Sequence, residues 1–597
     1  MTVARSDVRK WGAALGWYLL LPGVMALLSI TLTGFVYWKN NNVFHVPYVL
    51  QLFDHPEFKG DAFYATLPHF VSLVWPMVRI FSTEDNIPLV FEVANYLSRA
   101  AAFAGLIYLI RAGQGVTAAG VLICLIAVVL TPLMQSYSIV GGHGMFLEYF
   151  THSETTWGLI FLGTTLLATR RLTAGAAVLG IVFALNAFIG IWMGVAAAIA
   201  LLVSWRDLTV RGVLHMGAAF FTAASPVILW IALSVGSPTD GQPFRYIQYI
   251  REYFPDHFLI EAVPMKDLIK FGMLALVGVL AAFHLTATRF WVALQVGLLL
   301  VFLVGIPLPY LVDSRFIFNL HLLRAAGVEQ AIAVVLALVA AVKLIQTDAP
   351  GGGRYYGVAG VSLLTFLQPT VVTLASVGLA LLAPMLPGGP AIRRAKNYAR
   401  IILTVGLGVL VASELWSWAI RPFIDYGTLT PLITALLLIV TVLLRGIRPQ
   451  YRTAAVAAVL GGYLAFSVAP RMLDTRHSGQ GRQTDGDAMV SWIIQSDVHG
   501  TVLLPIDDPL ADVFQLSARR PIWVDKKQGA AVMWSPSFYT QWSTRMKEVA
   551  ALHTPTEYYQ YAKDHRIPNV LLASTAGECP APATTLRSTG RYVLCRP

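Results

Sequence analysis

Long apolar stretches, separated by short polar segments, fill the first 470 residues of the chain. The first stretch covers residues 11–36, which hold no charged side chain, and it follows Arg5, Arg9 and Lys10. About 20 consecutive apolar residues are enough to cross the hydrocarbon core of a bilayer as an α-helix. Because no small-residue cleavage site follows the first stretch, we expect it to be retained as a helix. The stretches up to residue 468 predict roughly 13 to 15 transmembrane helices.

Two of the apolar runs carry basic residues at both ends. Residues 174–204 lie between Arg171 and Arg206, and residues 355–387 lie between Arg354 and Arg393. Basic residues flank transmembrane helices mainly on the cytoplasmic side, so one helix would put the two ends of each run on opposite sides. We therefore expect a pair of short helices in each run, with breaks near residues 186–190 and at Pro369. Helices of this length are stable when they are packed inside the protein rather than facing lipid.

The basic clusters also orient the chain. They place the N-terminus in the cytoplasm and the more polar segments on the other, extracytoplasmic side. These segments are residues 37–90, 134–155, 236–265 and 309–324, with a further turn near residues 421–425.

The pattern changes after Pro470. Residues 474–487 form a polar linker, and short helix-like and strand-like patterns then alternate. We expect helices over residues 488–496, 511–518 and 554–565, and strands over 501–506, 521–525, 569–574 and 592–596. These patterns predict a transmembrane domain over residues 1–469 and a small soluble α/β domain over residues 470–597.

Composition supports a polytopic α-helical membrane protein. The chain is 56% hydrophobic and 13% charged, against about 25% charged residues in an average soluble domain. Because the lysines and arginines stand at the ends of the apolar stretches, the net charge of +11 does not indicate a nucleic-acid partner. Cys124 falls inside an apolar stretch, whereas Cys579 and Cys595 fall in the terminal domain. An extracytoplasmic location favours a disulfide between those two, with two free thiols as the alternative.

The ionisable residues suited to chemistry gather in the polar segments of the extracytoplasmic side. Residues 45–79, which we expect to form one long loop, are the most charged of these segments. Carboxylates on two segments, with arginine and histidine on two others, suit acid/base chemistry and anion binding, and plain solvation of the loops is the alternative. The residues concerned are Asp54, Glu57, Asp61, His143, Glu148, His152, Glu154, Arg251, Asp256, His257, Glu261, Asp313, Arg315, His321 and Arg324. Phosphate-binding glycine loops, zinc-protease motifs and serine-nucleophile motifs are absent from the sequence.

Four segments carry a resemblance to a known family: LFDHPEFKGDAFY, REYFPDHF, NLHLLRA and SARRPIWVDKK. With the layout of the chain, they resemble the GT-C superfamily of membrane glycosyltransferases, and more closely an uncharacterised bacterial group of GT-C-like proteins. That group tends to carry an acidic first loop, a histidine-rich loop and a terminal domain with R-x-x-x-x-x-x-K and W-x-x-R, here Trp542 and Arg545. The chain departs from the group where Asp256 and His257 replace a pair of histidines, which puts any paired-imidazole role in doubt.

The resemblance implies a membrane enzyme that transfers a sugar from a polyprenyl-phosphate donor to an extracytoplasmic acceptor, in the bacterial inner membrane with a periplasmic terminal domain. GT-C enzymes take their catalytic carboxylate from the first extracytoplasmic loop. Asp61 fits best, because it follows Gly60 and leads into aromatic residues, and Asp54 is the second choice. The candidates for binding the substrate and the leaving phosphate are Arg251, His257, Arg324, Glu148 and His143. Neither the sugar nor a metal requirement follows from the sequence.

Two alternatives come from other classes of protein. One is a transporter or flippase for a lipid-linked glycan, which needs polar groups along a path between the helices. The other is a non-catalytic partner in the assembly of envelope polysaccharide.

Overall fold

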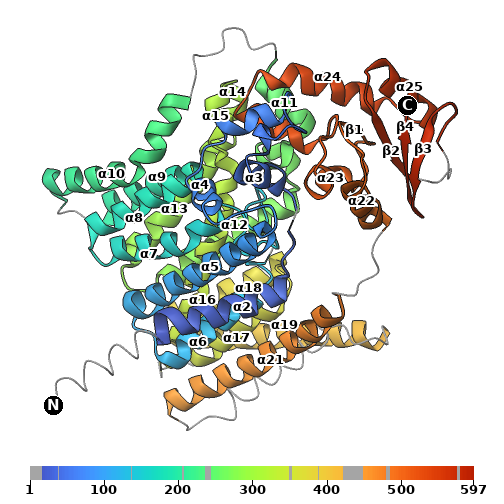
Figure 1. Ribbon diagram of the computed structural model, residues 1–597. Helices are drawn as coiled ribbons and strands as arrows, with labels where there is room; N and C mark the ends of the chain where they lie inside the picture. Colours follow the sequence, from blue (N-terminus) through green and yellow to red (C-terminus); the bar gives the residue numbers. More distant parts are fainter. Residues whose placement is uncertain are drawn as a thin grey trace, which may run out of the picture.

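The apolar stretches of the sequence form helices that pack into one bundle (Figure 1). The structure is a computed structural model that describes residues 16–37, 39–135, 137–204, 208–234, 244–347, 353–387, 389–420, 448–478, 485–573 and 579–597. The helices of the bundle are α2 (Leu21–Thr33), α5 (Ile87–Tyr108), α6 (Ala118–Leu130), α7 (Trp157–Ala168), α8 (Leu172–Leu185), α9 (Ala187–Ser204), α10 (Val210–Ser234), α12 (Met265–Ala282), α13 (Thr288–Gly305), α16 (Ala325–Gln346), α17 (Gly353–Phe366), α18 (Val371–Leu382), α19 (Pro390–Ile420) and α21 (Pro449–Ser478).

Within the described residues, 6 helical segments are long and apolar enough to cross a membrane. They are Gly16–Thr33, Ile87–Gly113, Ala187–Ser204, Val210–Leu233, Thr288–Leu311 and Arg315–Gln346. The prediction of a polytopic helical membrane protein with a small C-terminal α/β domain is therefore confirmed. The count of roughly 13 to 15 spans stays a prediction. The turn expected near residues 421–425 lies outside the described residues.

The helix α16 forms the centre of the bundle. Its sequence is mostly apolar on every side, which is typical of a helix with no face toward water, and all of its residues except Lys343 and Gln346 are buried. Helices α6, α12, α13 and α17 pack around it.

Both predicted helix breaks are confirmed. Asn186 separates α8 from α9, and its side chain accepts a hydrogen bond from the N–H of Ile189 at 3.2 Å, which caps the second helix. Pro369 lies between α17 and α18. The hydroxyl of Thr370 then caps α18 by accepting from the N–H of Thr373 at 3.0 Å.

The expectation of one long loop over residues 45–79 is wrong. The segment is built of short helices instead: α3 (Asn42–Val49), η2 (Leu52–Asp54), η3 (Tyr64–His69) and α4 (Val74–Arg79). Its aromatic and aliphatic side chains are buried, Trp75 and Leu67 completely, and burial of that apolar surface offsets the entropy lost when the chain is ordered. Further short helices follow in the other polar segments: η5 (Glu154–Thr156), α11 (Tyr246–Tyr253), η6 (Pro255–His257), η7 (Ile260–Ala262), α14 (Leu308–Leu311), α15 (Arg315–Asn319) and η8 (Leu322–Arg324).

The terminal domain is a four-stranded sheet with helices. Its helices are α22 (Asp485–Gln495), α23 (Ala511–Ser517), η11 (Lys527–Met533), α24 (Phe538–Ala550) and α25 (Pro555–Asp564), and its strands are β1 (Val502–Leu503), β2 (Asn569–Ala573), β3 (Thr584–Ser588) and β4 (Tyr592–Arg596). The strand order is β1-β2-β4-β3, with β1 and β2 parallel and the other pairs antiparallel.

Some of the terminal-domain predictions need correction. Residues 521–525 form no strand, because Ile522 meets Val502 only in an isolated bridge. The strand β3 and the helix α24 were not predicted. The side chains of β3 are largely exposed, so the segment lacks the apolar alternation that marks a strand. The linker prediction is also partly wrong, because α21 continues to Ser478 and α22 begins at Asp485.

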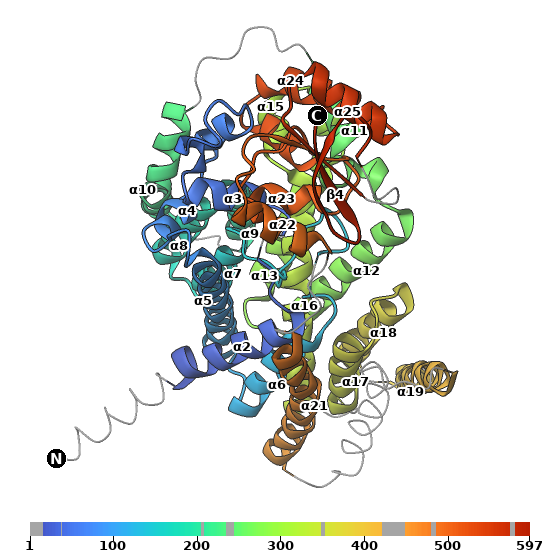
Figure 2. The same cartoon turned by 45° about the vertical axis from the view of Figure 1, so that its right-hand side comes forward.

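The terminal domain packs directly on the polar segments at one end of the bundle, as both ribbon views show (Figures 1 and 2). Helix α23 lies against α3. One hydrophobic cluster joins the side chains of residues 43–91 and 246–259 with those of the terminal domain. The boundary between residues 469 and 470 stays a prediction.

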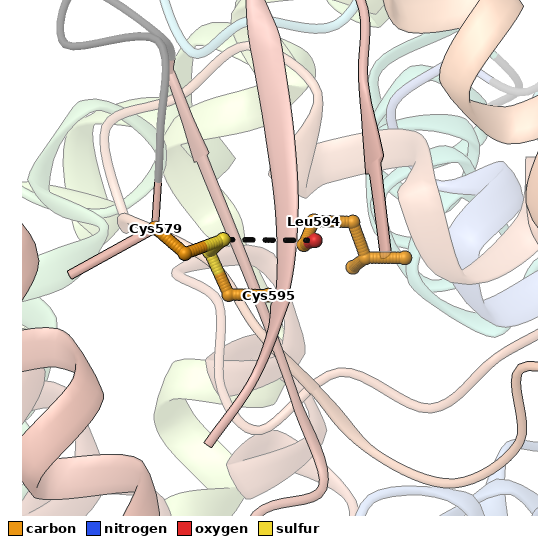
Figure 3. Close-up of a disulfide and its surroundings, with 3 residues drawn as sticks. All are labelled: Cys579, Leu594 and Cys595. Atoms are coloured by element: carbon orange, nitrogen blue, oxygen red, sulfur yellow. Dashed lines mark hydrogen bonds between the residues drawn. A yellow bond between two sulfur atoms is a disulfide. The ribbon is translucent and has the colours of Figure 1, made fainter. Parts of the chain in front are cut away.

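The terminal domain carries the disulfide that the sequence allowed (Figure 3). Cys579 is bonded to Cys595 on β4, with 5.8 Å between the two Cα atoms. Cys124 is a free thiol, buried in α6. The alternative of two free thiols in the terminal domain is therefore wrong.

Candidate functional site

The candidate site is built around Arg324, at the start of the central helix. Arg324 is the N-cap residue of α16, and its Nε atom is buried without a hydrogen bond. Among the residues that the structure describes, its guanidinium makes no hydrogen bond or ion pair. The helix dipole adds partial positive charge at this end of α16, while the N–H of Ala325 donates to carbonyls of the preceding helix η8. An unpaired arginine at this position favours an anionic ligand.

Histidines from three polar segments surround Arg324. We call Arg324 with His143, His152, His257 and His321 the Arg324 site. Burial first, and the charge of Arg324 second, lower the pKa of His143 well below its usual range and lower the pKa values of His152 and His257 to about 3. These imidazoles are therefore neutral near pH 7, and each can both donate and accept a hydrogen bond.

Buried imidazole nitrogens of the Arg324 site have no partner among the described residues. They are Nε2 of His143 and Nδ1 of His152, whereas the ring of His257 meets the backbone of Gly141. A buried polar atom without a hydrogen bond costs about 1–3 kcal/mol. A bound ligand that accepts or donates hydrogen bonds would satisfy these atoms.

Two consecutive glycines allow the segment of residues 134–155 to approach Arg324 and His257 closely. Gly141 and Gly142 have φ values of +78° and +66°, in the left-handed region that favours glycine. A Cβ atom on Gly141 would lie 2.8 Å from Cα of Arg324, and one on Gly142 would lie 2.8 Å from the His257 ring. The sequence GGH at residues 141–143 therefore brings His143 and His257 against the start of α16.

An aromatic wall closes one side of the Arg324 site. His143 stacks on Trp157 with 5.3 Å between ring centroids, and His45 stacks on Trp75 at 3.9 Å. His45 also meets the edge of His152 at 5.7 Å. On another side, His321 lines a narrow pocket with Phe258, Phe318 and Leu322. The volume of this pocket is about 10 Å³, which is room for a single water molecule.

Asp61, the predicted catalytic base, lies just before η3, which begins at Tyr64. Its Oδ1 atom accepts hydrogen bonds from the N–H groups of Phe63 at 2.9 Å and Tyr64 at 3.1 Å, as an N-cap does. Burial raises the pKa of Asp61, opposed by these two bonds and by the charge of Arg545. No hydrogen bond to its Oδ2 atom is found within the described ranges. Asp61 thus lies near Arg545 of α24. Within the described residues, no contact joins Asp61 to Arg324.

The other predicted residues are more exposed. Asp54 is exposed at the end of η2. Arg251 is exposed and ion-paired with Glu261 at 2.7 Å. Glu148 forms an ion pair with Lys39 near the surface. The structure thus brings His143, His257 and Arg324 together, and leaves Arg251 and Glu148 in surface ion pairs.

Sequence reasoning missed residues that the fold brings to this region. His45 was seen only as the start of a polar segment, and Lys527 belongs to the terminal domain, about 200 residues beyond Arg324. The one signal was the segment SARRPIWVDKK, whose last residue is Lys527. Within the described residues no group of three or more His, Cys, Asp and Glu side chains is arranged to hold a metal ion.

Comparison with known proteins gives one structural likeness. No family model matches the chain, and no curated protein matches it. Among solved structures, the chain is similar to ArnT from Cupriavidus metallidurans bound to undecaprenyl phosphate. The identity is 13%, the alignment covers 98% of each chain, and the TM-score is 0.44. ArnT is a glycosyltransferase of the GT-C type, the superfamily that the sequence resembles.

Proposed function

We propose that this protein is a membrane glycosyltransferase that takes a sugar from a polyprenyl-phosphate carrier and passes it to an extracytoplasmic acceptor. The observation that carries the proposal is the unpaired Arg324 at the N-terminus of the buried helix α16, among neutral histidines. This arrangement favours a phosphate group.

The position of the Arg324 site supports a lipid carrier over a soluble phosphate. Arg324 stands near the start of the apolar segment Arg315–Gln346, which is long enough to span a membrane. A ligand at that level is reached from the bilayer boundary, and a polyprenyl tail does not leave the bilayer. The phosphate of such a lipid would lie on Arg324 while its tail remains among apolar side chains.

The proposed reaction is a displacement at the sugar. The hydroxyl oxygen of the acceptor forms a bond to the anomeric carbon, the bond from that carbon to the phosphate oxygen breaks, and the phosphate leaves with the electron pair. Arg324 stabilises the charge on the leaving phosphate. Asp61 accepts the hydroxyl proton at Oδ2, and its raised pKa suits a general base.

One continuous segment links the two groups. Asp61 lies just before η3, and Phe70, just after that helix, packs on His152 with 5.9 Å between ring centroids. Trp534 of the terminal domain lies over Phe70 at 4.9 Å. A sugar–phosphate could extend along this segment from the Arg324 site toward Asp61.

The proposal is tested by separating binding from turnover in purified protein. Arg324→Gln should weaken binding of undecaprenyl phosphate roughly ten- to a hundred-fold, because a charge-assisted contact contributes about 1.5–3 kcal/mol. Arg251→Gln is the matched control, since it removes an arginine from a surface ion pair. Equal affinities for wild type and Arg324→Gln would overturn the assignment of the phosphate site.

Asp61→Asn tests the base. Asparagine is also a good N-cap, so the two backbone hydrogen bonds of η3 are kept while the proton acceptor is lost. Turnover of a panel of polyprenyl-phosphate sugars should fall by about 10²–10⁴-fold with binding unchanged. Asp54→Asn, at an exposed position, should have little effect. Full turnover by Asp61→Asn would rule out this carboxylate as the base.

A transporter of a lipid-linked glycan is the second candidate, because the bundle itself holds unsatisfied polar groups. Both carboxyl oxygens of Glu329 and the Oε1 atom of Gln295 are buried without a hydrogen bond to any described residue. In this case Glu329→Gln would slow the movement of a fluorescent polyprenyl phosphate between leaflets of proteoliposomes. Wild-type protein that moves this lipid and never turns over a donor would favour the transporter.

A further inference from the structure

A short helix of the terminal domain is held against the segment that leads to Arg324. The helix η11 (Lys527–Met533) presents backbone carbonyls to side chains of the transmembrane domain. Tyr249 donates to the carbonyl of Gly529 at 2.7 Å, and Asn319 donates to that of Met533 at 3.0 Å. Arg315 donates to the carbonyl of Met533 at 3.1 Å and to that of Trp534 at 3.0 Å. These bonds hold the backbone of η11 in place, because none depends on its side chains.

Lys527 is the first residue of η11. The docking of η11 places the side chain of Lys527 near the Arg324 site. Its ammonium donates a hydrogen bond to Oδ1 of Asn40. The amide of Asn40 then donates to the hydroxyl of Tyr137, and that hydroxyl lies 3.1 Å from the hydroxyl of Tyr149. Asn40 has a φ of +53°, a left-handed backbone that asparagine tolerates better than most residues.

The chain of hydrogen bonds ends at the hydroxyl of Tyr149, which lies within electrostatic range of Arg324. Burial raises the pKa of Tyr149 well above its usual range, and the nearby charge of Arg324 opposes that shift. The pKa of His257 is lowered by burial, then by Arg324, and then by Lys527, so both cations act on one imidazole. The pKa of His45 is lowered by burial, then by His152, and then by Lys527. Lys527 and Arg324 therefore both lie within electrostatic range of His257.

We propose that the terminal domain completes the phosphate site by supplying Lys527, so that Arg324 of the transmembrane domain and Lys527 of the terminal domain bind one phosphate-bearing ligand. This inference rests on the proposed function, because it takes the Arg324 site as the phosphate site. Two cations match the charge of a phosphate monoester dianion better than Arg324 alone. The histidines, being neutral, supply hydrogen bonds and no charge. The terminal domain is then part of the binding site, and docking of η11 is a condition for binding.

The neighbouring lysine provides a matched control. Lys526 is exposed, carries the same charge and precedes Lys527 by one residue. Lys527→Gln should weaken binding of undecaprenyl phosphate to the full-length protein about ten-fold or more, and Lys526→Gln should leave it unchanged within about two-fold. Binding of undecaprenol, which lacks the phosphate, should be the same in both variants. Competition by inorganic phosphate at equal concentration distinguishes a site for the free ion from a site for the lipid.

Further variants separate charge from structure. Lys527→Arg keeps the charge and should retain binding within about three-fold, whereas Asn40→Ala removes the hydrogen bond and leaves the charge of Lys527 in place. If both cations hold one phosphate, the loss in the double variant Arg324→Gln/Lys527→Gln should differ from the product of the two single losses.

The outcomes separate this inference from the proposed function. Weakening by Arg324→Gln together with wild-type binding by Lys527→Gln overturns the role of Lys527 and leaves the proposed function standing. If Arg324→Gln and Lys527→Gln both bind like the wild type, the role of Lys527 and the proposed function are overturned together. Equal weakening by Lys526→Gln and Lys527→Gln would overturn the role of Lys527 by reducing it to surface charge. If Lys527→Gln does not fold, loss of binding by Lys527→Arg in a folded protein overturns the inference, and retained binding supports it.

Discussion

At the scale of single residues, a buried ion pair holds the segment that carries two histidines of the Arg324 site. Arg99 and Glu154 have side chains that are 1% exposed, and their closest atoms are 3.7 Å apart. Arg99 donates to the carbonyl of Leu147, and Glu154 accepts from the N–H of Leu147 at 3.0 Å. Arg99 also donates to Ser29 at 3.0 Å. The backbone between His143 and His152 is therefore fixed from both sides.

Arg99→Met should destabilise the protein by about 3–5 kcal/mol, because it leaves Glu154 as a buried group without its partner. Thermal unfolding of the purified protein in detergent measures the effect. Arg111→Met is the matched control, since Arg111 lies exposed over the ring of Trp17 at 4.3 Å, where such a contact contributes about 0.5–1 kcal/mol. Similar melting temperatures for the two variants would show that the buried pair does not hold the segment.

The histidines of the Arg324 site predict a loss of stability in acid. The pKa values of His152 and His257 are about 3 in the folded protein, against 6.5 for the free side chain. Between these values the unfolded chain binds more protons, so stability is full above pH 6.5 and falls as the pH is lowered. The slope is about 1.4 kcal/mol per pH unit for each histidine. His152→Gln should reduce the pH dependence of the melting temperature, whereas His69→Gln, at an exposed position, should not. An unchanged slope in His152→Gln would contradict the burial of a neutral imidazole.

At the scale of elements, the disulfide ties the entry of β3 to β4. It closes a sequence separation of 16 residues, and in the loop-entropy model a bridge of that length contributes about 3 kcal/mol. Replacing both Cys579 and Cys595 with alanine should lower the melting temperature of the terminal domain and speed its proteolysis. Reductant should lower the stability of the wild type and leave the double variant unchanged. Insensitivity of the wild type to reductant would argue against the bridge in solution.

The sequence predicted most helices of the bundle, because each needs only a local apolar run. The breaks at Asn186 and Pro369 followed from charge at both ends of a run, a rule that also acts locally. The short helices of residues 45–79 were missed, since their burial comes from the terminal domain: Phe44, for example, lies 5.2 Å from Trp534. Strand β3 was missed because its order comes from pairing with β4 and not from a local apolar pattern.

The site was less predictable than the bundle. His143, His257 and Arg324 were named from the sequence. Arg251 was named with them, because a sequence does not distinguish an arginine in a surface ion pair from a buried arginine. Lys527 and Asn40 hydrogen-bond across 487 residues of sequence separation. No local pattern contains such a contact. The assignment of Asp61 as the base stays a prediction, since the structure gives one of its oxygens to a helix cap.

At the scale of the whole molecule, the proposed chemistry requires the terminal domain and the Arg324 site to lie on the extracytoplasmic side. Basic residues at the helix ends predict this orientation. The native cysteines do not interfere with a labelling test, because Cys124 is buried and Cys579 and Cys595 are bonded to each other. A single introduced cysteine therefore reports its own side of the membrane.

Ser588→Cys, at an exposed position of β3, should react with a membrane-impermeant maleimide in intact spheroplasts. Arg289→Cys, exposed near the start of α13, lies at a predicted cytoplasmic turn and should react only after lysis. If Arg289→Cys reacts in intact spheroplasts and Ser588→Cys reacts only after lysis, the Arg324 site lies on the cytoplasmic side. An acceptor and a donor of the proposed kind do not meet there. The proposed function would then fail together with the predicted orientation. Reaction of both positions in intact spheroplasts would instead contradict the predicted span between them, because α13 and the segment Arg315–Gln346 would then not separate the two sides.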